Sequence, residues 1–283
     1  MPEPGVCAVV LAAGEGIRLR PLTRSTPKAL CPVGNVPMLD RALAAVASLG
    51  FSGPESVAVN AWYLPDRLAA HVGGRAHVSI EDGRAPLGSA GGLGALRDWI
   101  GGRHVLVANA DAYLAGGELA PLLSGWDGRE VRLLGVPAGD RAPEFGRYLF
   151  AGFSLLPGAM AATLLPEPTD LVRTVWRPAE SAGKLSVVDY GGTYLDCGTP
   201  PSYLAANLDA ARRSPTGSLV GAGARVPGIV SDSVVGDRAV VVGSVERSVV
   251  WADCTVAADE RLSDAIRYDG GTVDARTPAA TRL

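Results

Sequence analysis

The stretch LAAGEGIRLRPLTRSTPKALCPV, from Leu11 to Val33, follows an apolar run and combines two glycines, two well-placed cations and three prolines. Gly14 and Gly16 leave the backbone bare, so its N–H groups can come close to an anion. Arg18 offers a planar guanidinium that suits phosphate oxygens, and Lys28 adds a second, movable charge. Three prolines restrict the backbone around these cations: Pro21, Pro27 and Pro32. The stretch predicts a phosphate-binding loop.

Known short motifs do not explain this loop. The dinucleotide fingerprint G-x-G-x-x-G fails because Leu19 stands at its third glycine. The P-loop pattern G-x-x-x-x-G-K-[ST] occurs nowhere in the chain, and the S-x-x-K of Ser25 to Lys28 has no K-T-G or S-D-N partner. A bare G-x-G also fits a solvated surface loop, so other segments of the chain are needed to distinguish this interpretation from a phosphate-binding loop.

Apolar runs and helical patterns alternate along the first two thirds of the chain. Strands are expected at Val6–Ala12, Val57–Val59, Val78–Ile80, Val105–Ala108 and Val131–Val136. Helices are expected at residues 38–49, 65–72, about 93–100 and 200–213. This alternation predicts a Rossmann-like, doubly wound α/β domain over residues 1–214, with a mostly parallel sheet. Ligands of such sheets bind beyond the carboxyl ends of the strands.

The sequence changes in character after residue 216. Serines recur every fifteen residues from Ser218 to Ser263. Two sets of valines share this spacing: Val220, Val235 and Val250, and Val226, Val241 and Val256. The period favours a short β-helix-like repeat domain over residues 217–275, rather than a set of valine-rich antiparallel hairpins. Residues 276–283 are expected to form a loose tail.

Composition, net charge and the cysteine pattern exclude several classes of function. The chain has 283 residues, 47% of them hydrophobic, and a net charge of −3. A general nucleic-acid binder is therefore not expected, and an anionic ligand must be held by local cations. The four cysteines form no C-x-x-C pair, which predicts buried reduced thiols and a cytoplasmic location. Neither a zinc site, a signal peptide nor a membrane span is predicted.

The N-terminal stretch as a whole resembles the signature of the sugar-1-phosphate nucleotidyltransferases, LAAGxGxRLRPLT…PKxLxPV…PML. The matching segments are 11–14, 16, 18–23, 27–28, 30, 32–33 and 37–39. Ile17 departs from the pattern, since relatives often carry a small polar residue there. The resemblance implies the reaction NTP + sugar 1-phosphate → NDP-sugar + pyrophosphate, with Mg²⁺ as cofactor.

The same resemblance implies the nucleotide-binding residues. The first loop would frame the nucleotide through Leu11, Ala12, Ala13, Gly14 and Gly16. EDGRAPLGSAGGL, from Glu81, looks like the family's base-side loop. Gly88 would let the backbone approach the base, and Glu81 would accept hydrogen bonds from it. The alternative for Glu81 is a solvated acid at the end of a strand.

Four residues are implied as catalytic. Asp111 in VLVANADAYL and Asp196 in GGTYLDCGTP stand where the family has metal-binding aspartates, although Ala110 replaces a frequent glycine. Two carboxylates suit Mg²⁺ on phosphate oxygens. Arg18 would steady the departing pyrophosphate, and Lys28 would bridge the α-phosphate and the sugar phosphate.

The sugar, the base and the role of the repeat are less defined. Gly152 in YLFAGFSLLP would lie close to the sugar, and Asn60 is either a sugar contact or a strand-end turn residue. The family's Glu-Lys pair before this strand is missing.

Guanylyl transfer from GTP to mannose 1-phosphate or a similar sugar is favoured. The alternatives are uridylyl or other nucleotidyl transfer to an amino-sugar or other sugar phosphate, and a non-catalytic subunit that senses an NDP-sugar. The repeat is expected to serve packing or formation of a homodimer. Acyl transfer by the repeat is not expected, because no histidine follows His104.

Overall fold

The computed structural model describes residues 5–276, which divide into two compact units. The first comprises the described residues up to 15, with 27–29 and 39–194. The second comprises residues 16–26, 30–38 and those from 195 onward. This division differs from the boundary expected at residue 214, because two short N-terminal segments and a helix group with the repeat. Apart from Arg276, the expected tail lies outside the described residues.

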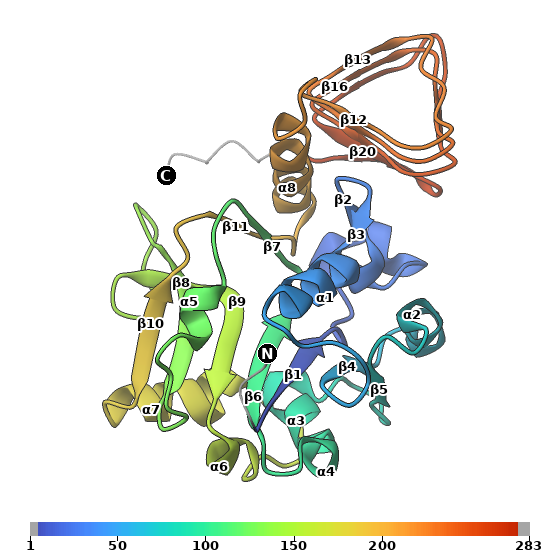
Figure 1. The fold of residues 1–283 in the computed structure, drawn as a ribbon. Helices are drawn as coiled ribbons and strands as arrows, with labels where there is room; N and C mark the ends of the chain where they lie inside the picture. Colours follow the sequence, from blue (N-terminus) through green and yellow to red (C-terminus); the bar gives the residue numbers. More distant parts are fainter. Residues whose placement is uncertain (1–4, 277–283) are drawn as a thin grey trace, which may run out of the picture. The chain divides into compact units, whose positions relative to one another are not determined.

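A seven-stranded sheet forms the centre of the first unit, in the order β10-β8-β9-β6-β1-β4-β5 (Figure 1). The strands are β1 (Val6–Leu11), β4 (Val57–Ala61), β5 (His77–Ile80), β6 (His104–Asn109), β8 (Val131–Pro137), β9 (Tyr148–Leu156) and β10 (Leu185–Asp189). All neighbours are parallel except β9, which runs antiparallel to both β6 and β8. The predicted mostly parallel α/β sheet is confirmed.

Helices of the first unit pack on this sheet. They are α1 (Met38–Ser48), α2 (Pro65–Val72), α3 (Gly88–Ala95), α4 (Arg97–Ile100), α5 (Ala120–Leu123), α6 (Gly158–Ala161), a π-helical turn (Val172–Trp176) and α7 (Arg177–Ser181). Ala90 and Leu93 of α3 join Val9 of β1 and Val107 of β6 in one buried apolar cluster. The helix expected near 93–100 is two helices, which divide at Leu96.

Short elements complete the chain outside the repeat. They are the 3-10 turns Ile17–Leu19, Leu22–Arg24 and Lys28–Leu30, strands β2 (Pro32–Val33), β3 (Val36–Pro37), β7 (Ala112–Ala115) and β11 (Thr193–Asp196), and helix α8 (Pro200–Arg212). Cys7, Cys31, Cys197 and Cys254 are buried thiols and none of them is in a disulfide, as predicted. Burial raises the pKa of the Cys7 thiol to about 11. Among residues 5–276, no helix combines the length and apolarity that a bilayer crossing needs.

Helix α8 ties the β2–β3 hairpin to the second unit. The buried Asn207 of α8 accepts a hydrogen bond from the Gly34 N–H at the hairpin turn, at 2.9 Å. Tyr203, one helical turn earlier, donates its hydroxyl to the carbonyl of Pro32 and accepts from Trp251 Nε1 at 3.0 Å. These buried polar contacts explain why residues 30–38 belong to the second unit.

The repeat folds into coils whose short strands form three ladders (Figure 1). The ladders are β12 (Leu219–Val220), β14 (Val234–Val235), β17 (Val249–Val250), β20 (Ala265–Tyr268) and β21 (Gly271–Asp274); β13 (Ile229–Ser231), β16 (Ser244–Glu246) and β19 (Arg261–Ser263); and β15 (Val240–Val241) with β18 (Thr255–Val256). All pairs are parallel except β20–β21. The predicted β-helix-like repeat is confirmed, and the antiparallel alternative is wrong.

Stacked serines line one corner of the coils. The Ser233 N–H donates to Ser218 Oγ at 3.2 Å, and the Ser248 N–H donates to Ser233 Oγ at 3.0 Å. The next donor to Ser248 Oγ is the N–H of Ala265, not of Ser263. Ser263 therefore keeps the fifteen-residue spacing of the sequence but does not continue the stack. The turn 257–260 is longer than its counterpart, so the register widens and Val249 pairs with Ile266.

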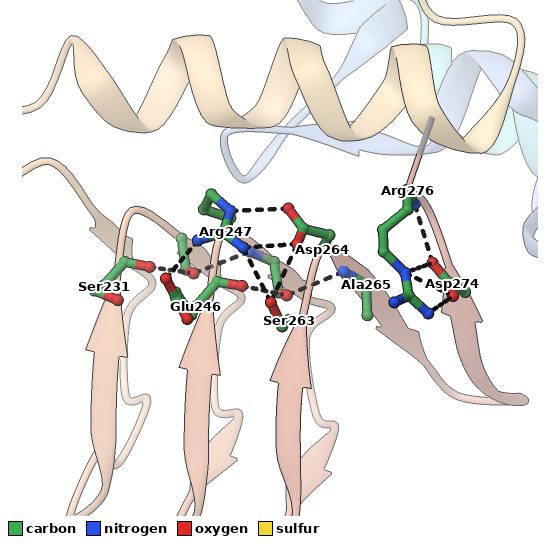
Figure 2. Close-up of polar contacts among 10 residues, drawn as sticks. Ser231, Glu246, Arg247, Ser263, Asp264, Ala265, Asp274 and Arg276 are labelled. Atoms are coloured by element: carbon green, nitrogen blue, oxygen red, sulfur yellow. Dashed lines mark hydrogen bonds and ion pairs between the residues drawn. The ribbon is translucent and has the colours of Figure 1, made fainter. Parts of the chain in front are cut away.

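Arg247 bridges neighbouring coils through its contacts with Ser263 and Asp264 (Figure 2). Arg247 has a φ of 44° and donates through Nε and Nη2 to the two carboxylate oxygens of Asp264, at 2.9 and 2.7 Å. It also contacts Glu246 and Ser263. The guanidinium lowers the pKa of Asp264 below its usual value. The contact between Arg247 and Asp264 thus lies within the second unit.

Replacing Ser233 with alanine tests the serine stack. Ser233 is fully buried, and its loss leaves the Ser248 N–H without an acceptor. An unpaired buried donor costs about 1–3 kcal/mol, so the free energy of unfolding should fall by about that much. Urea denaturation followed by circular dichroism measures it. Ser244→Ala, in a half-buried strand position, is the control and should change stability by less than about 0.5 kcal/mol. Equal stability of the two variants would contradict the stack's role.

Candidate active site

A cavity of about 250 Å³ opens at the carboxyl ends of β1, β4 and β6. Its lining consists of Leu11, Ala13, Gly14, Asn60, Pro86, Gly88, Ser89, Asn109 and Asp111. Leu11 pairs in register with Asn60 on one side and Asn109 on the other. The sheet thus brings together residues from the three segments that the sequence analysis singled out. Pro86, Ser89 and Asn109 were not predicted, although Asn109 ends the same strand that precedes Asp111.

Lys28 and Asp111 form an ion pair beside this cavity. The Lys28 ammonium contacts Asp111 Oδ2 directly. Lys28 is only 9% exposed, whereas the Asp111 side chain is 34% exposed. A buried ammonium requires a partner, so the carboxylate holds the lysine at this position. The predicted cation and the predicted metal-binding carboxylate are therefore in direct contact.

Glu81 and Asn60 form a buried network under the cavity. Asn60 Nδ2 donates to Glu81 Oε1 at 2.7 Å, and Asn60 Oδ1 accepts from the Ala12 N–H at 2.7 Å. Glu81 Oε2 accepts from the Leu87 N–H at 2.8 Å. Asn60 and Glu81 are 2% and 5% exposed. The carboxylate of Glu81 is thus engaged on both oxygens and is no solvated strand-end acid.

Glycines of α3 allow the chain segment 165–169 to lie against the helix. A Cβ at Gly88 would lie 2.5 Å from the Thr169 carbonyl oxygen, and one at Gly91 would lie 2.2 Å from that of Glu167. The Thr169 carbonyl accepts from the N–H groups of Ala90 and Gly91 at 3.2 and 3.4 Å. Gly88 also has a φ of +72°, which disfavours other residues. The glycine-rich sequence therefore has a packing role as well as its place at the cavity.

Gly152 has a similar packing role. It adopts a φ of +82°, and a Cβ there would lie 2.4 Å from Ala112 Cβ. The lining of the cavity includes neither Gly152 nor Ala12, Lys28 or Glu81. Ala12 and Glu81 are both hydrogen-bonded to Asn60, which does line the cavity.

Arg18 and Asp196 lie together in the second unit. Arg18 Nη2 is 3.7 Å from Asp196 Oδ2, and the side chains are 70% and 49% exposed. A Cβ at Gly198 would lie 2.7 Å from Arg18 Nη2 and 3.0 Å from both Asp196 oxygens. Gly16 has a φ of 69° and its carbonyl accepts from Thr23 Oγ1 at 2.8 Å. The 3-10 turn Ile17–Leu19 thus holds an exposed cation beside the carboxylate at the end of β11, a contact that the sequence analysis did not predict.

The model of the MobA-like NTP transferase domain matches residues 8–189, more than half of the chain. The chain belongs to this family. The resemblance to sugar-1-phosphate nucleotidyltransferases is confirmed by relatives that carry such names. One is the mannose-1-phosphate guanylyltransferase of Mycobacterium tuberculosis, 34% identical over 122 residues, which are 42% of this chain and 33% of that protein.

A second relative acts on another base. The N-acetylmuramate alpha-1-phosphate uridylyltransferase of Caulobacter vibrioides is 32% identical over 137 residues, 45% of this chain and 55% of that protein. The matched region thus spans about a third to about a half of the length of these two relatives. A Bacillus anthracis structure assigned as a glucose-1-phosphate thymidylyltransferase shares the fold, with a TM-score of 0.57, 20% identity and coverage of 72% of this chain and 95% of that one.

Gly91→Ala tests the packing of α3 on segment 165–169. Alanine is the better helix former by about 1 kcal/mol, but its Cβ would overlap the Glu167 carbonyl. We expect the overlap to dominate and to lower the free energy of unfolding by about 1–3 kcal/mol. Gly14→Ala is the control for stability, because a Cβ there meets nothing within 4 Å. Both free energies come from urea denaturation, and a stabilised Gly91→Ala protein would contradict the packing.

Proposed function

We propose that the protein transfers a nucleotidyl group from an NTP to a sugar 1-phosphate and releases pyrophosphate. One observation carries the proposal. The cavity at the ends of β1, β4 and β6 is lined by Asp111, which holds the buried Lys28, and by the loop that follows β1 and contains Gly14 and Gly16, called the glycine loop below. Membership of the MobA-like NTP transferase family and the names of the relatives support it. Local cations can then bind phosphates although the chain is acidic overall.

The chemistry needs positioning more than proton transfer. A sugar-phosphate oxygen forms a bond to the α-phosphorus, and the bond from that phosphorus to the bridging oxygen breaks, with its electrons leaving on pyrophosphate. We propose that Lys28 neutralises charge that develops on the α-phosphate and that Arg18 binds the departing pyrophosphate. Leu11 to Gly14 and Gly16 would supply backbone N–H groups, and Gly88 would border the base.

Nucleotidyltransferases of this family generally use a divalent metal. When bound, Mg²⁺ would screen the phosphate charges. Asp111 fits such an ion, because its carboxylate is partly exposed at the cavity and already holds a cation. Asp196 is proposed as a further ligand on the resemblance and on its exposed carboxylate.

For the substrates, we propose GTP and mannose 1-phosphate or a similar sugar phosphate. The guanylyltransferase relative supports this choice. Uridylyl transfer to an amino-sugar phosphate is the second candidate, and the uridylyltransferase relative, at 32% identity against 34%, supports it almost equally. Gly152 remains the proposed residue on the sugar side. Asn60 is proposed to act there as part of the cavity wall, because its amide is held by the Ala12 N–H and by Glu81. The coiled repeat is proposed to mediate dimerisation.

Pyrophosphate release tests the proposal. The purified protein with Mg²⁺ is incubated with each of ATP, GTP, UTP, CTP and dTTP in combination with a panel of sugar 1-phosphates. We expect release that depends on one NTP and on one sugar phosphate. Tight binding of a nucleotide sugar without release from any pair would contradict the enzyme and favour a sensing subunit.

Lys28→Ala should lower kcat about 100- to 1000-fold, because a preorganised cation in a water-poor site contributes several kcal/mol to transition-state binding. The matched control is Lys184→Ala, which removes the only other lysine in the sequence. Lys184 is exposed immediately before β10, so its loss should leave kcat unchanged. Circular dichroism checks that both variants fold. Near-normal turnover of a folded Lys28→Ala protein would refute the assigned role.

A further inference from the structure

We propose that Glu81 is a positioning residue that sets the two walls of the nucleotide cavity and does not read the base. The inference rests on the proposed nucleotidyl transfer and concerns the same cavity. One wall is the loop after β1, and the other is the start of α3. Glu81 reaches the first wall through Asn60 and the second through the Leu87 N–H.

The carboxylate is closed in by its partners. Its Oε1 accepts from Asn60 Nδ2 and its Oε2 accepts from the Leu87 N–H, and the residue is 5% exposed. Helix α3 covers it from another side: a Cβ at Gly92 would lie 3.0 Å from Glu81 Oε1 and 2.6 Å from Asn60 Nδ2. A buried carboxylate with two N–H donors is well satisfied, and charge assistance strengthens both bonds. A base has no comparable access to these oxygens.

Asn60 transmits this anchoring to the glycine loop. Its amide can face only one way, because the Ala12 N–H requires the carbonyl oxygen and the Glu81 carboxylate requires the amino group. The Ala12 N–H is thereby fixed immediately before Ala13 and Gly14, which line the cavity. The position of the loop thus depends on Glu81, which never touches it.

The second wall is held in the same way. Leu87 precedes Gly88, the first residue of α3, and its N–H donates to Glu81. Its carbonyl accepts from the Thr169 N–H at 2.9 Å. One carboxylate therefore connects the loop after β1, the end of β4 and the start of α3, which together set the width of the cavity.

An exchange of polarity between positions 60 and 81 tests the proposal. Glu81→Gln leaves one acceptor oxygen, so the new amino group faces either the Asn60 amino group or the Leu87 N–H, both of which are donors. Asn60→Asp places a second carboxylate next to that of Glu81, and the two repel each other. In the double variant Asn60→Asp/Glu81→Gln, the new amide can donate to the new carboxylate. The Ala12 and Leu87 N–H groups keep oxygen acceptors, and the net charge of the pair is unchanged.

Two readouts apply: kcat/KM for every NTP that the protein accepts, and NMR hydrogen exchange of the Ala12 and Leu87 amides without ligand. Each single variant should lower kcat/KM about tenfold, in proportion for all NTPs, and should speed exchange, because one hydrogen bond of about 1.4 kcal/mol corresponds to tenfold. The double variant should return to within about threefold of the unmodified protein. Asp82→Asn, which changes the exposed neighbouring carboxylate, should alter neither readout.

Several results would overturn the proposal. If Glu81 reads the base, Glu81→Gln changes the ratio of kcat/KM between NTPs and the double variant does not recover. Unchanged exchange at Ala12 and Leu87 in both single variants also contradicts it. If the unmodified protein transfers nothing, the proposed function fails, and exchange alone still decides on Glu81. If a single variant does not fold, a folded double variant supports the network and an unfolded one refutes it.

Discussion

The register of three parallel strands is the constraint on which the candidate site depends. Leu11 at the end of β1 pairs with Asn60 of β4 and Asn109 of β6, so the three strands end side by side. The connections that follow are fixed there too. The Ala110 N–H donates to the Leu11 carbonyl at 3.0 Å, and the Ala12 N–H donates to Asn60 at 2.7 Å. The glycine loop therefore starts from a fixed point.

Two charged side chains are buried near the carboxyl ends of β1, β4 and β6, where the low dielectric strengthens their electrostatic interactions. Lys28 and Glu81 are almost completely buried, and each is stabilised by a specific partner, Asp111 for the first and N–H donors for the second. Charges in a low dielectric interact more strongly than charges in water. In the proposed function, the Lys28 ammonium supplies local positive charge at the site although the net charge of the chain is −3. In contrast, the Arg238–Asp253 pair of the repeat is well exposed on both sides, so solvent screens the attraction between its charges.

Much of the fold could be predicted from the sequence, because buried parallel strands are continuous apolar runs. Both ends of Val6–Leu11 and of His104–Asn109 lie within one residue of the expected ranges. Strand β10 was missed because it is half-buried at the sheet edge and lacks such a run. The fifteen-residue period predicted the coils, but not the wider register at Ile266, which comes from a turn with no repeat of its own.

The site was less predictable, because a motif identifies residues without their partners. The ion pair of Lys28 with Asp111 joins positions far apart in sequence, and only the folded sheet brings them together. The sequence likewise placed Gly88 beside the base, but it did not show that a Cβ there would lie 2.5 Å from the Thr169 carbonyl oxygen. Glu81 illustrates the same limit, since acceptors buried by tertiary contacts resemble surface acids in a sequence.

Transfer of a labelled α-phosphate tests the central claim most directly. The protein is incubated with NTP labelled at the α-phosphorus and with the sugar 1-phosphate that supports pyrophosphate release. If the site directs attack at the α-phosphorus, all of the label that leaves the NTP should appear in the nucleotide sugar, and Lys28→Ala should suppress it. Label that appears in free nucleoside monophosphate, or that stays in NTP while only the γ-phosphate is lost, would contradict nucleotidyl transfer.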